Sequence, residues 1–169
     1  RVRQGGRGGG GGPRTSTFTP SQSARRPRVT ARRIRPLSGP ETRRSASADR
    51  PTGVAIAPNG DIFVTDGHLP NAHNNGRVLK FSKDGKFIKT WGKKGSAPGE
   101  LEGPHALAMD SRGRLYVGDR TNNRVQVFDQ DGNYIEEWKQ YGAPSGMYID
   151  AKDNIYVADS QNSRVVGVF

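Results

Sequence analysis

The chain has 169 residues with 27 Lys and Arg against 16 Asp and Glu, and the excess positive charge is confined to one end. Residues 1–50 hold 13 Arg and two acidic residues, a net charge of +11, whereas the charges of 51–169 balance. The lack of Cys excludes disulfides and thiolate metal sites, and no run reaches the roughly 18 apolar residues of a membrane-spanning helix, so we expect no membrane insertion.

The Arg- and Gly-rich segment 1–50 is predicted to be a disordered tail. Its four Val, Ile and Leu residues and its one aromatic, Phe18, bury too little apolar surface to offset the entropy of ordering. A basic arm can bind nucleic acid by neutralising phosphates, but Arg-Gly-Gly occurs once, at Arg7. The use of Arg without Lys also fits a segment that is not native to the protein. We therefore do not expect nucleic acid to be a partner.

From residue 51 onward the chain repeats one pattern three times. Each copy contains short apolar runs separated by turn residues such as Pro-Asn-Gly and Asp-Gly, which favour hairpins. A repeat of about 40 to 50 residues with four strands is typical of a β-propeller blade. The same residue types recur at three positions in every copy: Pro51, Pro104 and Pro144; Asp66, Asp119 and Asp159; Arg77, Arg124 and Arg164.

The repeat predicts an all-β partial propeller whose blades span 51–91, 104–138 and 144–169. The third copy has no fourth apolar run, so we expect a fragment of about two and a half to three blades, with the missing blades of a larger ring as its partners. The expected strands, in chain order, lie at 54–56, 62–64, 78–81 and 87–91, at 106–109, 115–117, 125–128 and 134–138, and at 147–149, 155–157 and from 165 onward.

The recurrent Asp and Arg of each copy are predicted to stabilise the scaffold. In the second copy Asp119 ends one strand, and Arg124 begins the next after a turn of four residues. An ion pair across the turn, or hydrogen bonds from the carboxylate to the backbone, would hold this hairpin together. Because the pair recurs in all three copies, we assign it a structural role and not a catalytic one.

The pattern apolar-D-x-x-x-N-x-R-apolar, followed by D-G-x-apolar and W, resembles the NHL repeat over residues 51–169. That resemblance implies a six-bladed propeller. The stretch GPHALAMDSRGRLYVGDRTNNRVQVFDQDG, with RPTGVAIAPNGDIFVTDGH before it, also resembles bacterial relatives of peptidyl-α-hydroxyglycine α-amidating lyase. That enzyme cleaves a peptidyl hydroxyglycine to a peptide amide and glyoxylate.

The resemblance to the lyase implies a zinc site on the propeller axis, made by His residues at the starts of the inner strands. His105, in the motif Pro-His-Ala-Leu, matches one such ligand, whereas Thr52 and Ser145 stand at the equivalent places of the other copies. A catalytic zinc needs about three protein ligands, so further His residues are expected from blades outside this chain. Arg120, which follows the recurrent residue Asp119, matches an Arg of the family that binds the substrate carboxylate.

One turn is six residues longer than its counterparts, and it begins where the family has a tyrosine. The motif D-G-Y of the lyase reads Asp-Gly-His here, with His68 in place of the tyrosine. We expect the base that takes the substrate's hydroxyl proton to lie near His68. His68 and His73 are spaced by five and could bind a metal ion together, or they could be two solvated loop side chains.

The expected function is therefore that of a fragment of a zinc-dependent, lyase-like propeller acting on a small peptide-like substrate, and the fragment alone is expected to be inactive. Its predicted site residues are His105 as metal ligand and Arg120 and His68 as catalytic residues. The alternative is a non-catalytic propeller that binds a protein or another ligand on its rim, because one fold supports many functions. Nucleic-acid binding through the tail is the third and weaker alternative.

Overall fold

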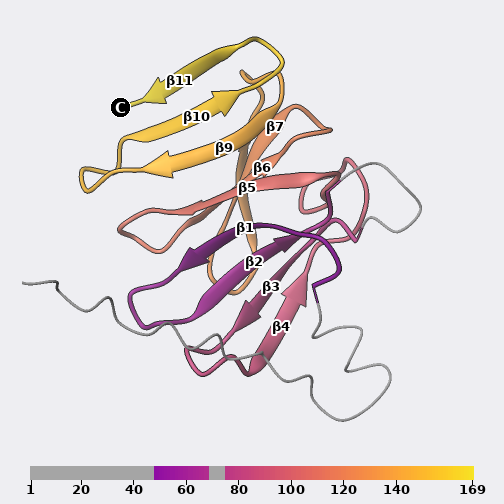
Figure 1. Cartoon of the computed structure of the whole chain (residues 1–169), viewed down its shortest axis with the longest axis vertical. Helices are drawn as coiled ribbons and strands as arrows, with labels where there is room; N and C mark the ends of the chain where they lie inside the picture. Colours follow the sequence, from indigo (N-terminus) through magenta and orange to yellow (C-terminus); the bar gives the residue numbers. More distant parts are fainter. Residues whose placement is uncertain (1–47, 69–74) are drawn as a thin grey trace, which may run out of the picture. The chain divides into compact units, whose positions relative to one another are not determined.

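The computed structural model describes residues 48–68 and 75–169, and this part of the chain contains strands and turns but no helix (Figure 1). The tail predicted to be disordered lies outside the described residues except for residues 48–50, and His73 lies outside them as well. No helix that could span a membrane is present in the described ranges.

The strands form three antiparallel sheets, each of which follows the order of the chain. The all-β partial propeller predicted from the repeat is confirmed, whereas the number of blades in the complete ring stays a prediction. The first sheet contains β1 (Pro51–Ile56), β2 (Ile62–Asp66), β3 (Arg77–Phe81) and β4 (Phe87–Trp91); the second contains β5 (Pro104–Met109), β6 (Leu115–Asp119), β7 (Arg124–Phe128) and β8 (Tyr134–Trp138); the third contains β9 (Pro144–Ile149), β10 (Ile155–Asp159) and β11 (Arg164–Val168).

The turn between the first two strands of each sheet needs one residue in the left-handed region. Gly60 takes this place in the first sheet with φ of 90°, and Gly113 takes it in the second with φ of 78°. In the third sheet Asp153 takes it with φ of 62°. Gly adopts such angles without strain, and Asp is among the residues that tolerate them. The Asn-Gly and Arg-Gly of the first two copies and the Lys-Asp of the third therefore make the same turn.

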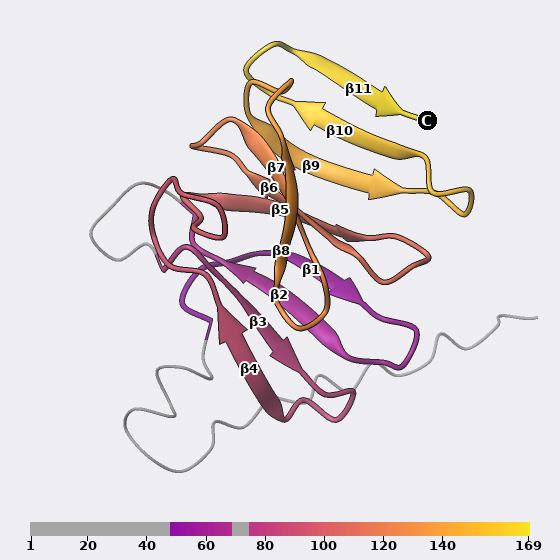
Figure 2. The same cartoon turned by 180° about the vertical axis from the view of Figure 1, so that it is seen from behind.

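The first strands of the three sheets, β1, β5 and β9, lie next to one another, as Figures 1 and 2 show from opposite sides. They are thus the inner strands of three successive blades. The hydroxyl of Thr52 at the start of β1 donates a hydrogen bond of 2.5 Å to the backbone oxygen of Pro104 at the start of β5. The starts of the inner strands therefore meet at one end of the blades.

Apolar side chains fill the two spaces between successive sheets. The strands β6 and β7 are buried along their whole length, because the second sheet has a neighbour on each face. Each fully buried side chain of this kind contributes about 1.5–3 kcal/mol. The core between the first two sheets includes Phe63, Val78, Leu107, Val117 and Phe128, and the core between the second and third includes Tyr116, Val125, Val127, Ile155 and Val157.

The outward faces of the first and third sheets are apolar and open. Val54 and Ile56 on β1 are 59% and 67% exposed, and Tyr148 on β9 and Val165 on β11 are 65% and 70% exposed. Their counterparts in the second sheet are covered by a neighbouring blade. These two faces are the apolar surfaces that the described sheets leave open.

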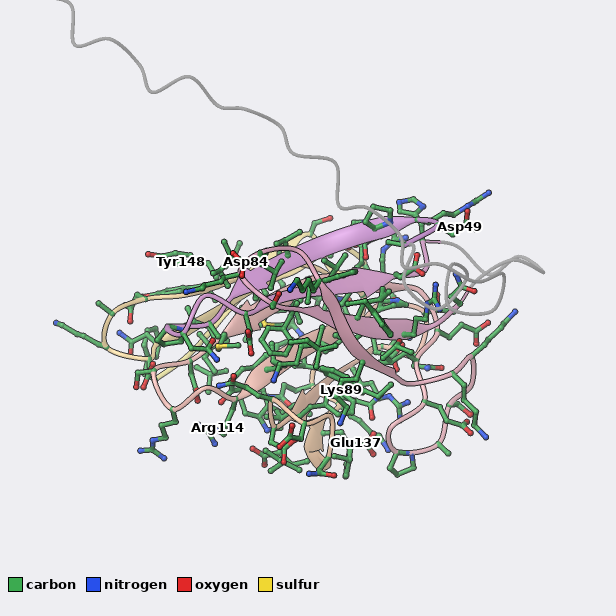
Figure 3. All side chains as sticks on the ribbon, turned by 90° about the horizontal axis from the view of Figure 1, so that it is seen from below. Asp49, Asp84, Lys89, Arg114, Glu137 and Tyr148 are labelled. Atoms are coloured by element: carbon green, nitrogen blue, oxygen red, sulfur yellow. The ribbon has the colours of Figure 1, made fainter. Side chains whose placement is uncertain are left out.

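The predicted Asp–Arg pairs are present in all three sheets and so is the predicted bonding to the backbone. The distances from Arg Nε to Asp Oδ2 are 2.9 Å for Arg77–Asp66, 2.8 Å for Arg124–Asp119 and 3.1 Å for Arg164–Asp159. Arg124 also forms an ion pair of 2.7 Å with Glu137 of β8, which is labelled in Figure 3. The scaffold role assigned to the recurrent pair is therefore confirmed.

Candidate functional site

His105, the predicted metal ligand, is the second residue of β5 and is half-buried at the shared end of the inner strands. Its Nδ1 lies 2.8 Å from the backbone oxygen of Ser145, the second residue of β9. A carbonyl oxygen can only accept, so Nδ1 carries the hydrogen, and Nε2 of the neutral ring keeps its lone pair. Imidazoles that bind a metal ion are commonly oriented in this way, with the other nitrogen bonded to a backbone carbonyl.

The structure brings His68 of the first blade to His105 of the second. The two ring centroids are 5.2 Å apart, and the ring planes are inclined by 46°. Gly67 precedes His68 and has φ of 141°, and its N–H donates a hydrogen bond of 3.0 Å to the backbone oxygen of Arg50. This glycine turns the chain away from the end of β2, so that the exposed imidazole of His68 reaches the neighbouring blade.

Arg120, the predicted carboxylate-binding residue, follows directly after β6 and is half-buried. Its Nε donates a hydrogen bond of 3.1 Å to Oγ of Ser145. Within the described ranges no carboxylate lies at ion-pair distance from Arg120, in contrast to Arg124, which pairs with both Asp119 and Glu137. Among the described residues the terminal nitrogens of Arg120 have no carboxylate partner, and a guanidinium can bind a carboxylate as a bidentate fork.

Ser145 connects the two predicted residues, a role that the sequence analysis did not identify. Its carbonyl accepts from His105 and its hydroxyl accepts from Arg120, while Ser160 places its own hydroxyl 2.7 Å from that of Ser145. The sequence contained a signal for this link. Ser145 stands at the position of His105 in the repeat and Ser160 stands at that of Arg120, so the geometry of a propeller places both beside the second blade's residues.

Asp119 anchors the segment that carries Arg120. Its Oδ1 accepts a hydrogen bond of 2.7 Å from the backbone N–H of Glu102, and its Oδ2 accepts from Asn122 and Arg124 at 2.8 Å each. Burial between two blades raises the pKa of the Asp119 carboxyl, against the opposing hydrogen bond from Asn122. For the equivalent Asp159 of the third sheet, the hydrogen bond from Asn162 dominates and lowers the pKa.

The residues described at this end fit part of a metal site and not a complete one. No group of three or more His, Cys, Asp or Glu side chains lies close enough together to hold a metal ion in the described ranges. The places equivalent to His105 in the other two blades hold the hydroxyls of Thr52 and Ser145, which are engaged in hydrogen bonds. His68 and His105 thus provide two imidazoles at this end, and a metal ion bound there would need further ligands.

A cavity of about 350 Å³ lies at the opposite end of the inner strands and contains none of the predicted site residues. Its carboxylates are already used in turns, because Asp110 accepts from the backbone and side chain of Arg114, and Asp153 accepts from Ser111. We therefore place the candidate site at the end that holds His105.

The model of the NHL repeat matches three segments of the chain, at residues 49–81, 101–128 and 142–168. Each segment corresponds to one of the three sheets and includes its Asp–Arg pair. The repeat predicted from the sequence pattern is therefore confirmed.

Curated relatives include amidating enzymes. The chain is 42% identical over 79 residues to peptidyl-glycine alpha-amidating monooxygenase B of Xenopus laevis, a match that covers 43% of this chain and 8% of that protein. It is 46% identical over 44 residues to peptidyl-alpha-hydroxyglycine alpha-amidating lyase 1 of Drosophila melanogaster, covering 26% of this chain and 7% of that protein. It is also 36% identical over 74 residues to human NHL repeat-containing protein 3, covering 44% of this chain and 20% of that protein.

Among solved structures, virginiamycin B lyase from Staphylococcus aureus superposes with a TM-score of 0.54 over 71% of this chain and 38% of that chain. The sequence identity of 16% limits this likeness to the fold. The chain thus spans a small part of its curated relatives and less than half of the solved structure.

Proposed function

The chain belongs to the NHL repeat family, and from this premise we propose that it forms part of a zinc-dependent propeller that cleaves peptidyl α-hydroxyglycine to a peptide amide and glyoxylate. The observation that carries the proposal is the hydrogen bond from Nδ1 of His105 to the backbone of Ser145, because it leaves Nε2 available at the meeting point of the inner strands. The local identity to an amidating lyase supports the same assignment.

In this proposal His105 is one of the protein ligands of zinc, and other blades supply the rest. A bound zinc ion would act as a Lewis acid toward the oxygens of the substrate. His68 is the second functional imidazole of the site, because its ring contacts that of His105. Ser145 orients His105 and Arg120 together, since it holds one through its carbonyl and the other through its hydroxyl.

Arg120 binds the carboxylate of the hydroxyglycine residue. Its Nε is held by Ser145, so the plane of the guanidinium is fixed before the substrate arrives. In the reaction the substrate's hydroxyl loses its proton, the C–N bond breaks, and the amide nitrogen takes up a proton. The products are a peptide amide and glyoxylate, whose carboxylate stays on Arg120 until release.

The test is the release of glyoxylate from a peptidyl α-hydroxyglycine by the complete protein encoded by the gene. The proposal predicts turnover that a zinc chelator abolishes and that added zinc restores. Absence of turnover in a folded protein that contains zinc would contradict it. The rim-binding alternative has less support, because it leaves without a role the contact between the rings of His68 and His105 and the guanidinium of Arg120, which forms no ion pair among the described residues.

A further inference from the structure

We infer that His68 and His105 together form a two-imidazole binding site for a divalent transition-metal ion. The inference rests on the proposed role of His105 and extends it, because it assigns His68 as a second ligand within this chain. The catalytic role predicted for His68 from the sequence is then replaced by metal coordination.

The separation of the two rings fits a shared ion. Imidazole nitrogens bind zinc at about 2.0–2.1 Å, so each ring centroid lies roughly 3 Å from the ion, and two rings on a tetrahedral ion have centroids about 5 Å apart. The observed distance between the centroids of His68 and His105 is 5.2 Å. The inclination of 46° between the ring planes differs from a parallel stack, in which no ion could lie between the nitrogens.

The hydrogen bonds also fit two ligands. The bond from His105 to Ser145 uses Nδ1 and leaves Nε2 free to coordinate. Among the described residues, the contact with His105 is the one interaction of the His68 ring, and neither of its nitrogens has a hydrogen-bond partner there. The backbone next to His68 is fixed by the hydrogen bond from the N–H of Gly67 to the carbonyl of Arg50, and this bond does not constrain the imidazole ring.

An ion bound by two imidazoles keeps open positions. A tetrahedral zinc ion would have about two sites left for water, for a substrate oxygen or for ligands from other blades. Imidazole ligands suit zinc, copper and nickel, so the site should discriminate against magnesium and calcium, which prefer oxygen. A nitrogen that coordinates the ion cannot accept a proton, so His68 cannot then serve as the base through that atom.

The experiment uses the 169-residue chain without a polyhistidine tag and titrates it with zinc chloride alone. Isothermal titration and metal analysis after dialysis are compared for the wild type, His68→Ala, His105→Ala and His73→Ala. Loss of a residue that merely orients a ligand costs 10- to 100-fold in affinity, so removal of His68 or His105 is expected to lower zinc affinity at least about tenfold. His73→Ala is the matched control and should bind as the wild type does.

The outcomes separate this inference from the proposed function. Loss of affinity in His105→Ala with full affinity in His68→Ala overturns the pairing while it leaves the proposed function standing. Loss in His68→Ala and His73→Ala with His105→Ala unchanged also overturns it, because both ligands would then lie on the loop. Loss in both His68→Ala and His105→Ala supports the pairing even where the complete protein releases no glyoxylate.

A second measurement removes the dependence on folding of the variants. Imidazole ¹⁵N signals of the wild-type chain are recorded during the zinc titration. Both rings should show a coordinated nitrogen at the same zinc concentration, and Nδ1 of His105 should stay protonated. A response from one ring alone would overturn the pairing.

Discussion

The imidazole of His105 on β5 donates a hydrogen bond of 2.8 Å to the backbone carbonyl of Ser145 on β9. The equivalent residue of the first blade, Thr52, donates in the same direction to the backbone of Pro104. The first and second blades therefore each contact the start of the next inner strand through the same position of the repeat. In the second blade this contact also orients a side chain that can bind a metal ion, so a structural position of the repeat carries the candidate chemistry.

Arg120→Lys tests the carboxylate-binding role. Lysine keeps the charge but loses the planar fork and the Nε hydrogen bond to Ser145, so we expect weaker binding of glyoxylate or of the substrate by about tenfold with zinc content unchanged. The measurement is the KM for the substrate in the complete protein, or the Kd for glyoxylate. Arg112→Lys, in the turn at the other end of the same blade, is the control. Equal loss in both variants would contradict the assigned role.

Arg124 and Arg164 occupy the same place in two blades but should differ in their contribution to stability. The side chain of Arg124 is 4% exposed and also donates to the backbone oxygens of Ser96, Ala97 and Glu100, whereas that of Arg164 is 51% exposed. Removal of one partner from a buried ion pair costs about 3–5 kcal/mol. Exposed pairs contribute about 0–1 kcal/mol.

We therefore expect Arg124→Met to lower the free energy of unfolding several times more than Arg164→Met. Urea denaturation followed by tryptophan fluorescence measures both. Similar losses in the two variants would show that the hydrogen bonds from Arg124 to the backbone of residues 96–100 contribute little to the free energy of unfolding.

Acid should weaken the contact between the second and third blades. Asp153 accepts hydrogen bonds from the hydroxyl and the backbone N–H of Ser111 at 2.6 and 2.8 Å, and these bonds lower the pKa of its carboxyl below the ordinary value of 3.8. A lowered pKa in the folded state gives stability that is complete above 3.8 and is lost as the pH falls below that value.

Melting temperatures measured from about pH 6 to about pH 3 should fall less steeply for Asp153→Asn and Ser111→Ala than for the wild type. Asp153→Asn removes the carboxylate, whereas Ser111→Ala removes the hydroxyl donor and keeps the backbone N–H bond, so the effect should be larger in Asp153→Asn. An unchanged pH dependence in both would rule out this contribution.

The open faces of the first and third sheets should make the chain associate with itself. Val54 and Ile56 on one face, and Tyr148 and Val165 on the other, expose apolar surface of the kind that neighbouring blades cover. Sedimentation velocity should show assemblies of the chain. Val54→Lys with Ile56→Lys should reduce them, and Ile135→Lys on the middle sheet should not. A stable wild-type monomer would count against a larger ring.

The fold could be predicted because its determinants are local in the sequence. The Asp-Gly turns, the apolar runs and the recurrent Asp–Arg pairs each act within one hairpin, so their spacing is sufficient to place the strands. The contact between His68 and His105 joins two blades, and no short-range pattern encodes it. The family resemblance pointed to both residues separately, but it did not bring their rings together.

Ser145 is a second site residue whose contacts the sequence pattern could not predict. A serine hydroxyl is a poor zinc ligand, so the sequence assigns Ser145 no role in the site, yet its backbone oxygen and its hydroxyl hold His105 and Arg120. Backbone groups are the same in every residue, so the sequence cannot show which carbonyl faces a neighbouring blade. The sequence does not predict the hydrogen bonds from Arg124 to the backbone of the linker between the first two blades for the same reason.

The central claim is that His105 binds the catalytic metal, and His105→Ala in the complete protein tests it most directly. The variant loses one hydrogen bond, worth about 0.5–1.5 kcal/mol, so the protein should stay folded. Zinc content and glyoxylate release are measured on the same sample beside the wild type. We predict that both fall to a small fraction of the wild-type values while the fold persists. Full zinc content together with full turnover in His105→Ala would contradict the account.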